Sequence, residues 1–390
     1  MRRLCILNAS ESEAIVKWIW QRLDWPGFRW DAETLLPLLS KARLEQGMFL
    51  AKAKGLGFEL SREACVDVLI EEVVKTSEIE GAQLNRDAVR SSVAKHLGIP
   101  AFGLPQPTRS IDGLVEILLD ATRKYDRPLT EERLKAWQAA LFPTGYSGLL
   151  RIQTGEWRQG EDPMQVVSGG MGKEVIHFEA VPSSFVPKEM KQFFLWWQTS
   201  LGKIDGLLRA GLAHFYFITI HPFEDGNGRI ARALTDMALA QDEKVPTRFY
   251  SLSSQIMKEK KGYYEILERC QRGEMDITLW LAWFLESFTR ALESSKSLIA
   301  IVLDKALFWK YFGQSSLNDR QRKVVNLLLD AGRGKFLGGM TTKKYSSIAK
   351  TSRATAFREI TGLLEMQIFV QNPGKGRSTS YDLNWDVCKE

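Results

Sequence analysis

The sequence predicts a mainly α-helical protein with a β-hairpin in its middle and a small mixed domain at its C-terminal end. Apolar residues recur every three to four positions through most of the 390 residues, which is the spacing of helices with one buried face. β-branched runs flank a glycine turn in the middle of the chain, and the pattern changes after about residue 294. With 44% apolar and 26% charged residues, the composition excludes a disordered, collagen-like or coiled-coil chain.

The helical patterns begin near the N-terminus. Segment 11–22 is amphipathic, and Trp25-Pro26-Gly27 then breaks the chain. A second helix is expected after Asp31, because an aspartate side chain can accept hydrogen bonds from the first free amides of a helix. The same spacing predicts further helices at 61–79, 81–93, 111–125, 130–140, 186–201, 204–220, 228–241, 262–272 and 276–293.

One segment, 163–182, departs from the helical pattern. The turn residues Ser168-Gly169-Gly170 separate two β-branched runs, and a proline lies at each end. We therefore predict a β-hairpin inside an otherwise helical domain.

The last part of the chain predicts a winged helix-turn-helix domain. Helices are expected at 317–330, 342–349 and 352–364, followed by two strands around a glycine-containing turn. From Tyr311 to Glu390 there are 13 basic and 7 acidic residues, so this part carries the whole net charge of +6. A basic excess there points to nucleic acid, and a solvated basic surface is the competing interpretation.

Other features narrow the class of protein. The four cysteines are scattered, which indicates neither a disulfide framework nor a zinc site. The apolar part of the N-terminus is too short for a signal peptide, and no apolar run approaches the ~20 residues of a membrane span. We expect a cytoplasmic protein with no membrane partner.

The densest group of chemically active residues is the run HPFEDGNGRIAR at 221–232. A Gly-Asn-Gly loop that opens a helix is an anion site, because free amides and the helix dipole both favour phosphate. Arg229 and Arg232 share one helix face and suit a polyphosphate. Asp225 can ligate Mg²⁺, and His221 can take a proton from an attacking hydroxyl. Together they predict a phosphoryl-type transfer.

This run resembles the motif of the Fic (filamentation-induced-by-cAMP) family, H-x-F-x-[D/E]-G-N-G-R-x-x-R, at every specified position. The resemblance implies the Fic helical fold and transfer of AMP from Mg²⁺-bound ATP to a Ser, Thr or Tyr hydroxyl of a protein, including the chain itself. It implies His221 as general base, Phe223 as core anchor and Asp225 as metal ligand. The nucleotide phosphates would contact Gly226, Asn227, Gly228, Arg229 and Arg232.

The resemblance extends to two neighbouring segments. The hairpin at 163–182 stands where Fic proteins place a flap that aligns a target peptide as an added strand, with Val166, Val167, Ser168 and Gly169 near the nucleotide. Tyr264 and Gln271 resemble the adenine pocket, where relatives often have Asn in place of Gln271. The alternative for the segment 163–182 is an ordinary structural hairpin, and the alternative for Tyr264 and Gln271 is plain helix packing.

The segment Thr76-Ser77-Glu78-Ile79-Glu80-Gly81 resembles the Fic inhibitory motif [S/T]-x-x-x-E-[G/N]. Glu80 would compete with the γ-phosphate of ATP for Arg232 and act as a built-in brake. In relatives with this layout the same glutamate can position a water that removes AMP from the modified protein. Glu80 therefore has two candidate roles.

The resemblance gives a domain plan: a helical N-terminal domain over 1–105 with an inhibitory helix at about 61–80, a Fic catalytic domain over 106–295, and the winged helix over 296–390. The N-terminal tryptophans form either a core or a ligand cage, and we favour the core. On the winged helix, Arg353, Thr355 and Arg358 could enter a major groove, with Lys375 and Arg377 on phosphates. Docking to protein is the alternative there, and relatives are commonly dimers. The rival function is a DNA-binding regulator that uses its Fic core as a nucleotide sensor.

Overall fold

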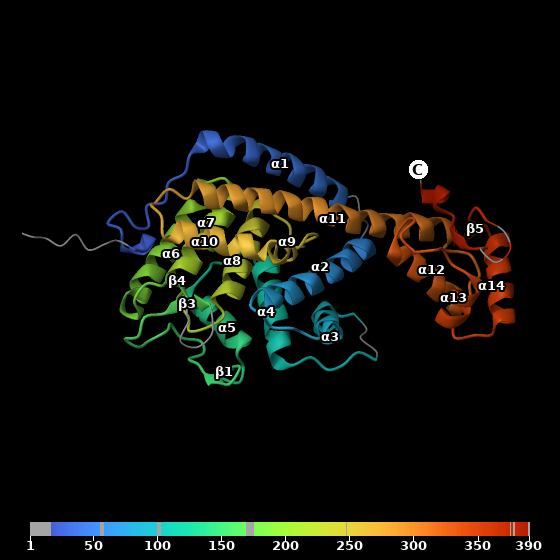
Figure 1. The fold of residues 1–390 in the computed structure, drawn as a ribbon, viewed down its shortest axis with the longest axis horizontal. Helices are drawn as coiled ribbons and strands as arrows, with labels where there is room; N and C mark the ends of the chain where they lie inside the picture. Colours follow the sequence, from blue (N-terminus) through green and yellow to red (C-terminus); the bar gives the residue numbers. More distant parts are fainter. Residues whose placement is uncertain are drawn as a thin grey trace, which may run out of the picture. The chain divides into compact units, whose positions relative to one another are not determined.

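The computed structural model describes residues 17–388 apart from 55–57, 100–102, 169–174, 247, 375 and 377–378. As predicted, the protein is mainly helical (Figure 1). It divides into two compact units. The first comprises the chain up to Ala42 with 70–247 and 252–288, and the second comprises 43–69, 248–251 and 289–390. None of the helices in the described residues is both long and apolar enough to cross a membrane.

Three helices contribute residues to both units, namely α1 (Ala32–Lys54), α2 (Phe58–Ile79) and α11 (Thr278–Phe312). The remaining helices of the first unit are α3 (Arg86–Leu97), α4 (Arg109–Arg123), α5 (Glu131–Leu141), α6 (Val186–Ser200), α7 (Gly206–Ile220), α8 (Asn227–Glu243), α9 (Leu252–Lys258) and α10 (Lys260–Gln271). Every residue from Leu207 to Ile220 is buried, so α7 is the central helix of this unit. Its sequence is apolar on all sides, which is the pattern of a helix surrounded by protein.

Two short hairpins lie in the first unit. Strands β1 (Tyr146–Ser147) and β2 (Leu150–Arg151) form one, and β3 (Gln165–Ser168) and β4 (Val175–Glu179) form the other. The second is the hairpin predicted at 163–182, and we call it the flap hairpin. Its register places Gln165 opposite Glu179, with an irregularity between Val166 and Val167.

The N-terminal tryptophans form core contacts with this hairpin. Trp18 is 1% exposed and packs edge-on against Phe178 of β4, with 5.4 Å between ring centroids. The indole of Trp20 donates to the carbonyl of Glu179 at 2.7 Å. Trp18 and Trp20 therefore pack against β4 as part of the core, which is the interpretation favoured from the sequence.

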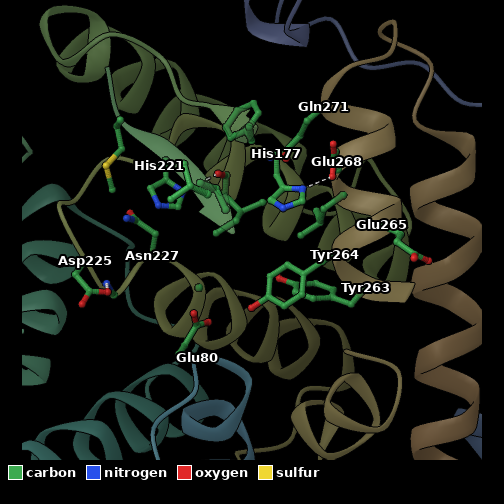
Figure 2. A pocket seen from close by; sticks show the side chains of 18 of the residues that line it. Glu80, His177, His221, Asp225, Asn227, Tyr263, Tyr264, Glu265, Glu268 and Gln271 are labelled. Carbon is green, nitrogen blue, oxygen red and sulfur yellow. Dashed lines mark hydrogen bonds and ion pairs between the residues drawn. The ribbon is translucent and has the colours of Figure 1, made fainter. Parts of the chain in front are cut away.

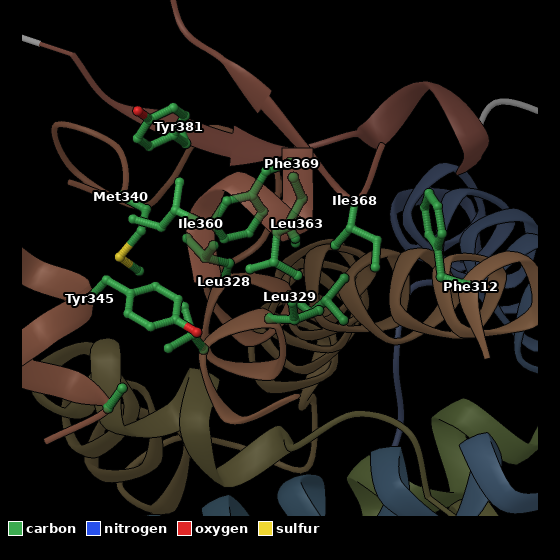
Figure 3. Close-up of a cluster of buried hydrophobic side chains, with 14 of the residues drawn as sticks. Phe312, Leu328, Leu329, Met340, Tyr345, Ile360, Leu363, Ile368, Phe369 and Tyr381 are labelled. Atoms are coloured by element: carbon green, nitrogen blue, oxygen red, sulfur yellow. The ribbon is translucent and has the colours of Figure 1, made fainter. Parts of the chain in front are cut away.

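The second unit closes around its own core. Its elements are α12 (Asp319–Ala331), α13 (Thr342–Ile348), α14 (Arg353–Glu365), β5 (Phe369–Gln371) and β6 (Tyr381–Leu383), in the order predicted from the sequence. Side chains from all of them and from the last turns of α11 form one apolar cluster (Figure 3). Each of the three helices begins at a polar cap residue, Asn318, Thr341 or Ser352.

Three predicted elements need correction. The helix expected over 11–22 is absent from its described part, where only a 3₁₀ turn at Ile19–Gln21 forms, because the Gln21 side chain accepts from the amides of Lys17 and Trp18. The helix expected at 81–93 is α3, which starts later, at the Asn85 cap. The helix expected to end at 293 continues to Phe312. Helix α9 and the β1–β2 hairpin were not predicted.

Candidate active site

The motif HPFEDGNGRIAR spans the turn from α7 into α8. His221 is the C-cap of α7 in a left-handed conformation, with φ 54° and ψ 58°. The Asn227 side chain closes the turn, because its Nδ2 donates to the carbonyl of Phe223 at 2.7 Å and its Oδ1 accepts from the amide of the same residue at 3.0 Å. Phe223 is fully buried. The loop is thereby a fixed frame that ends at the N-terminus of α8.

Two glycines of this loop lie close to neighbouring side chains. Gly226 has φ 91°, and a Cβ there would lie 2.9 Å from Leu141 and 3.0 Å from Phe142. A Cβ on Gly228 would lie 2.1 Å from Oε1 of Glu80. Any side chain at Gly228 would therefore collide with Glu80, and the bare backbone lets that carboxylate approach the start of α8.

The loop opens into a cavity of about 610 Å³ (Figure 2). Ten of the residues predicted from the sequence line it, from the turn that follows α2, the flap hairpin, the loop and α10: Glu80, Val166, Val167, His221, Asp225, Gly226, Asn227, Gly228, Tyr264 and Gln271. Arg229 and Arg232 are not among its lining residues. The side chain of Ser168 and the whole of Gly169 lie outside what the structure describes.

His221 is placed to act as a base. Its Nδ1 lies 3.2 Å from the carbonyl of Ile218, an arrangement in which Nδ1–H donates and Nε2 carries the lone pair. Burial lowers the pKa of His221 to about 4, with the Ile218 carbonyl opposing and the charge of Arg158 adding to the effect. The imidazole is therefore neutral at physiological pH.

Arg232 is held by the end of α2. Its Nη2 lies 2.6 Å from Oε1 of Glu80 and donates to the carbonyl of Thr76 at 2.9 Å, while its Nε donates to Oγ1 of Thr76 at 2.7 Å. The guanidinium is 2% exposed, and among the described residues its Nη1 has no hydrogen-bond partner. Burial is the largest single effect and would lower the pKa of Arg232, but the charge and hydrogen bond of Glu80, together with Tyr263 and Tyr264, outweigh it and raise the pKa.

Asp225 lies where the large cavity meets a second one of about 350 Å³ that Arg229 also lines. Its Oδ1 accepts from the amide of Gly226 at 2.5 Å, and its Oδ2 accepts from the hydroxyl of Ser147. Arg229 Nη2 is 3.7 Å from Oδ1. Within the described residues no group of three or more His, Cys, Asp or Glu could hold a metal. A single carboxylate beside a phosphate loop fits Mg²⁺ that arrives with a nucleotide, because Mg²⁺ typically binds through one or two carboxylates and substrate phosphates.

The opposite end of the cavity is formed by α10 and the flap hairpin (Figure 2). The Tyr264 hydroxyl donates to the carbonyl of Ile79 at 3.3 Å. Gln271 is buried and its Nε2 donates to Oγ1 of Thr219 at 3.2 Å. His177 Nδ1 on β4 lies 2.6 Å from Oε2 of Glu268 on α10, so this pair joins the hairpin to the helix.

Several residues of the site had no signal in the sequence. His177, Glu268 and Lys261 line the cavity, Ser147 holds Asp225, and Gln138 donates to the carbonyl of Asp225 at 3.4 Å. Each stands on a segment far from the motif along the chain. The short spacing from Tyr264 to Glu268 on one helix face was the one usable hint.

Comparison with known proteins identifies the class. Residues 128–239 match the sequence model of the Fic/DOC family, so the chain carries a Fic/DOC family domain. Residues 18–99 match a domain of unknown function (DUF4172). Protein adenylyltransferase fic-1 of Caenorhabditis elegans is 36% identical over 63 residues, which is 16% of this chain and only 12% of that protein.

The fold has a counterpart among solved structures. A Fic family protein from Desulfovibrio desulfuricans is 17% identical, with a TM-score of 0.53 over 91% of this chain and 97% of that one. A Fic domain containing signaling protein from Bacteroides thetaiotaomicron is 19% identical, with a TM-score of 0.48 over 67% of this chain and 98% of that one. The Desulfovibrio desulfuricans structure confirms the Fic helical fold expected from the sequence.

Proposed function

We propose that the chain is a protein adenylyltransferase that moves AMP from ATP to a Ser, Thr or Tyr hydroxyl of a protein, including itself. One observation carries the proposal. The neutral imidazole of His221 and the glycine loop at the start of α8 line the same cavity, whose volume of about 610 Å³ suits a nucleotide. A base beside an anion site is the arrangement that phosphoryl-type transfer needs.

In this reaction the target hydroxyl oxygen attacks the α-phosphorus of ATP and the bond to the β-phosphate oxygen breaks, releasing pyrophosphate. His221 Nε2 takes the hydroxyl proton, since Nδ1 is engaged by Ile218. The amides of Gly226, Asn227 and Gly228 bind phosphate oxygens, and Arg229 and Arg232 neutralise the charge of the leaving group. Bound through Asp225, Mg²⁺ would neutralise charge on the phosphates.

The remaining residues would place the two substrates. Tyr264 stacks on or covers the adenine, and Gln271 contacts its edge. Val166, Val167 and Ser168 belong to the flap strand beside which a target peptide would align, and Gly169, which lies outside the described residues, follows them in the sequence. Val167 is 50% exposed, which fits a strand that is open to a partner.

Glu80 would restrain the enzyme. Its ion pair with Arg232 occupies the guanidinium that the γ-phosphate requires, so ATP bound beside it is misaligned. The same carboxylate lines the cavity and could hold a water for removing AMP from a modified protein. Loss of Glu80 raises transfer in the first role and abolishes removal in the second.

Intact-mass measurement tests the proposal. Wild type, Glu80→Gly and Glu80→Gly/His221→Ala are incubated with Mg²⁺ and ATP. We expect an AMP increment on the single variant, a weak one on wild type and none on the double variant. If labelled ATP modifies nothing in any variant, with or without cell lysate, transferase activity is excluded.

A second candidate is a nucleic-acid-binding regulator in which the Fic domain senses nucleotide. The exposed side of α14, the third helix of a winged-helix order, carries Arg353 and Arg358. Thr355 is half-buried beside them, and Lys375 and Arg377 lie outside the described residues. Arg353→Ala/Arg358→Ala should abolish salt-dependent duplex DNA binding, whereas a protein-docking unit would show none at all. Dimerisation and a cytoplasmic location stay predictions.

A further inference from the structure

Arg158 is a buried cation behind the base. It follows β2 in the loop before the flap hairpin and is 4% exposed. Its guanidinium donates to main-chain carbonyls: Nε donates to His221 at 2.7 Å, and Nη2 donates to Val181 and, at 3.4 Å, to Ile220. Its own amide donates to the carbonyl of Pro222 at 2.9 Å. One residue thus binds three consecutive peptides of the catalytic turn and the end of the flap hairpin.

The turn it binds needs such support. His221 has φ 54°, and a non-glycine residue in the left-handed region is costly unless its surroundings fix it. Carbonyls at the C-terminus of a helix carry partial negative charge and favour a cation. Arg158 supplies that cation at the end of α7 and at the peptide whose rotation would swing the imidazole.

We propose that Arg158 is the positioning residue of the catalytic base: it locks the left-handed peptide of His221 and ties it to the flap hairpin through Val181. The inference rests on the proposed transferase function. It gives the base and the target-binding hairpin a shared anchor, so that a hairpin displaced at Val181 also releases the His221 peptide.

The charge of Arg158 also supports the proposed role of His221 as a base, because it favours the neutral imidazole. Burial is the main cause that lowers the pKa of His221, and the Arg158 guanidinium lowers it further. Glu80, just after α2, and Asp225 from the loop oppose this by favouring the protonated imidazole. Removing Arg158 should therefore leave His221 easier to protonate as well as less well oriented.

The chain offers a matched control in Arg209. Its guanidinium is 1% exposed and donates to Oγ of Ser200, to the Gln241 side chain and to the carbonyl of Trp197. Burial lowers the pKa of both arginines to about 10. Loss of either guanidinium should destabilise the first unit similarly, but only Arg158 contacts the catalytic turn.

The experiment uses full-length Glu80→Gly protein carrying Arg158→Met, Arg158→Lys or Arg209→Met. Initial rates of self-modification are measured against ATP concentration from pH 5 to 9, on protein that is folded by circular dichroism. For Arg158→Met we expect kcat to fall about 100-fold, the cost of a base misplaced by about 1 Å, with KM for ATP within about twofold. The fall in rate on the acid side of the pH profile, its acid limb, should move to higher pH. Arg158→Lys keeps the charge and one hydrogen-bond donor. Its kcat should therefore be about tenfold higher than that of Arg158→Met, and its acid limb should return to the pH of the parent.

Each possible result either supports or contradicts the inference about Arg158. Arg209→Met should keep kcat within about twofold. If Arg158→Met and Arg209→Met lower kcat equally, or if Arg158→Met raises KM alone, Arg158 is structural and the inference fails. If Arg158→Met does not fold, the test rests on Arg158→Lys. In that case, a kcat and an acid limb that are both unchanged from the parent overturn the inference. An inactive Glu80→Gly parent would instead remove the proposed function.

Discussion

The ion pair between Glu80 and Arg232 gives the sharpest prediction. Removing the carboxylate by Glu80→Gly breaks a 2.6 Å contact to a guanidinium that is 2% exposed, while both bonds to Thr76 stay. A hydrogen bond to a charged group contributes about 1.5–3 kcal/mol. Since the Glu80 side chain is 33% exposed, we take about 2 kcal/mol, which corresponds to about a 30-fold shift toward an available Arg232.

The assay is the initial rate of AMP incorporation, measured by intact mass at saturating ATP. Glu80→Gly should exceed wild type about 30-fold. Glu78→Gly is the matched control, because it places the same glycine on the same turn and removes only a half-buried pair with Lys75. Its rate should stay within about threefold of wild type.

Two results would refute the reasoning. Equal rates for Glu80→Gly and Glu78→Gly would mean that helix fraying, rather than release of Arg232, activates the enzyme. A Glu80→Gly rate equal to that of wild type, with incorporation in both abolished by His221→Ala, would mean that the pair does not restrain transfer.

Three further predictions concern pH and stability. In Glu80→Gly, kcat/KM should stay level down to about pH 5 and fall below it as His221 protonates, because burial lowers the pKa of His221 to about 4. A fall in kcat/KM centred near pH 6.5 would contradict this. Glu359 accepts from Arg320, Asn318 and Tyr345, and these bonds outweigh burial and hold its pKa below 4.5. Its contribution to stability is therefore complete above pH 4.5 and is lost as pH falls through the lowered value. Glu359→Gln should cost about 1–3 kcal/mol at pH 7 and flatten that acid dependence in thermal unfolding, and an unchanged curve would contradict it. Trp18→Ala should lower the free energy of unfolding by about 3 kcal/mol in urea, because it empties a buried ring site against Phe178; a loss under 1 kcal/mol would show that β4 does not depend on it.

The sequence predicted the parts of the molecule that depend on residues close together in the chain. Helix spacing and cap residues located most helices, and the loop from His221 to Arg232 was recognisable because its residues are contiguous. The contact between Glu80 and Arg232 was also expected and is present. In each case the signal lies within one segment or in a motif of fixed spacing.

What the sequence did not predict depends on tertiary packing. Arg158, Gln138 and Ser147 reach the loop that starts at His221 from positions 63 or more residues away, with no periodicity to mark them. A 3₁₀ turn at Ile19–Gln21 stands in place of the expected helix, because the Gln21 side chain accepts from the amides of Lys17 and Trp18 while the Trp20 ring bonds β4. The continuation of α11 past residue 293 was not predicted, because the composition changes there while the backbone stays helical to Phe312.

That uninterrupted α11 has a practical consequence for dissecting the protein. Phe308 and Phe312, at its end, belong to the buried core of the second unit. A fragment that starts at the next breaker, Gly313, would lack both rings, and one cut at residue 296 would begin partway along a helix. Limited proteolysis should therefore spare 278–312, and a stable C-terminal fragment for expression must retain the last turns of α11.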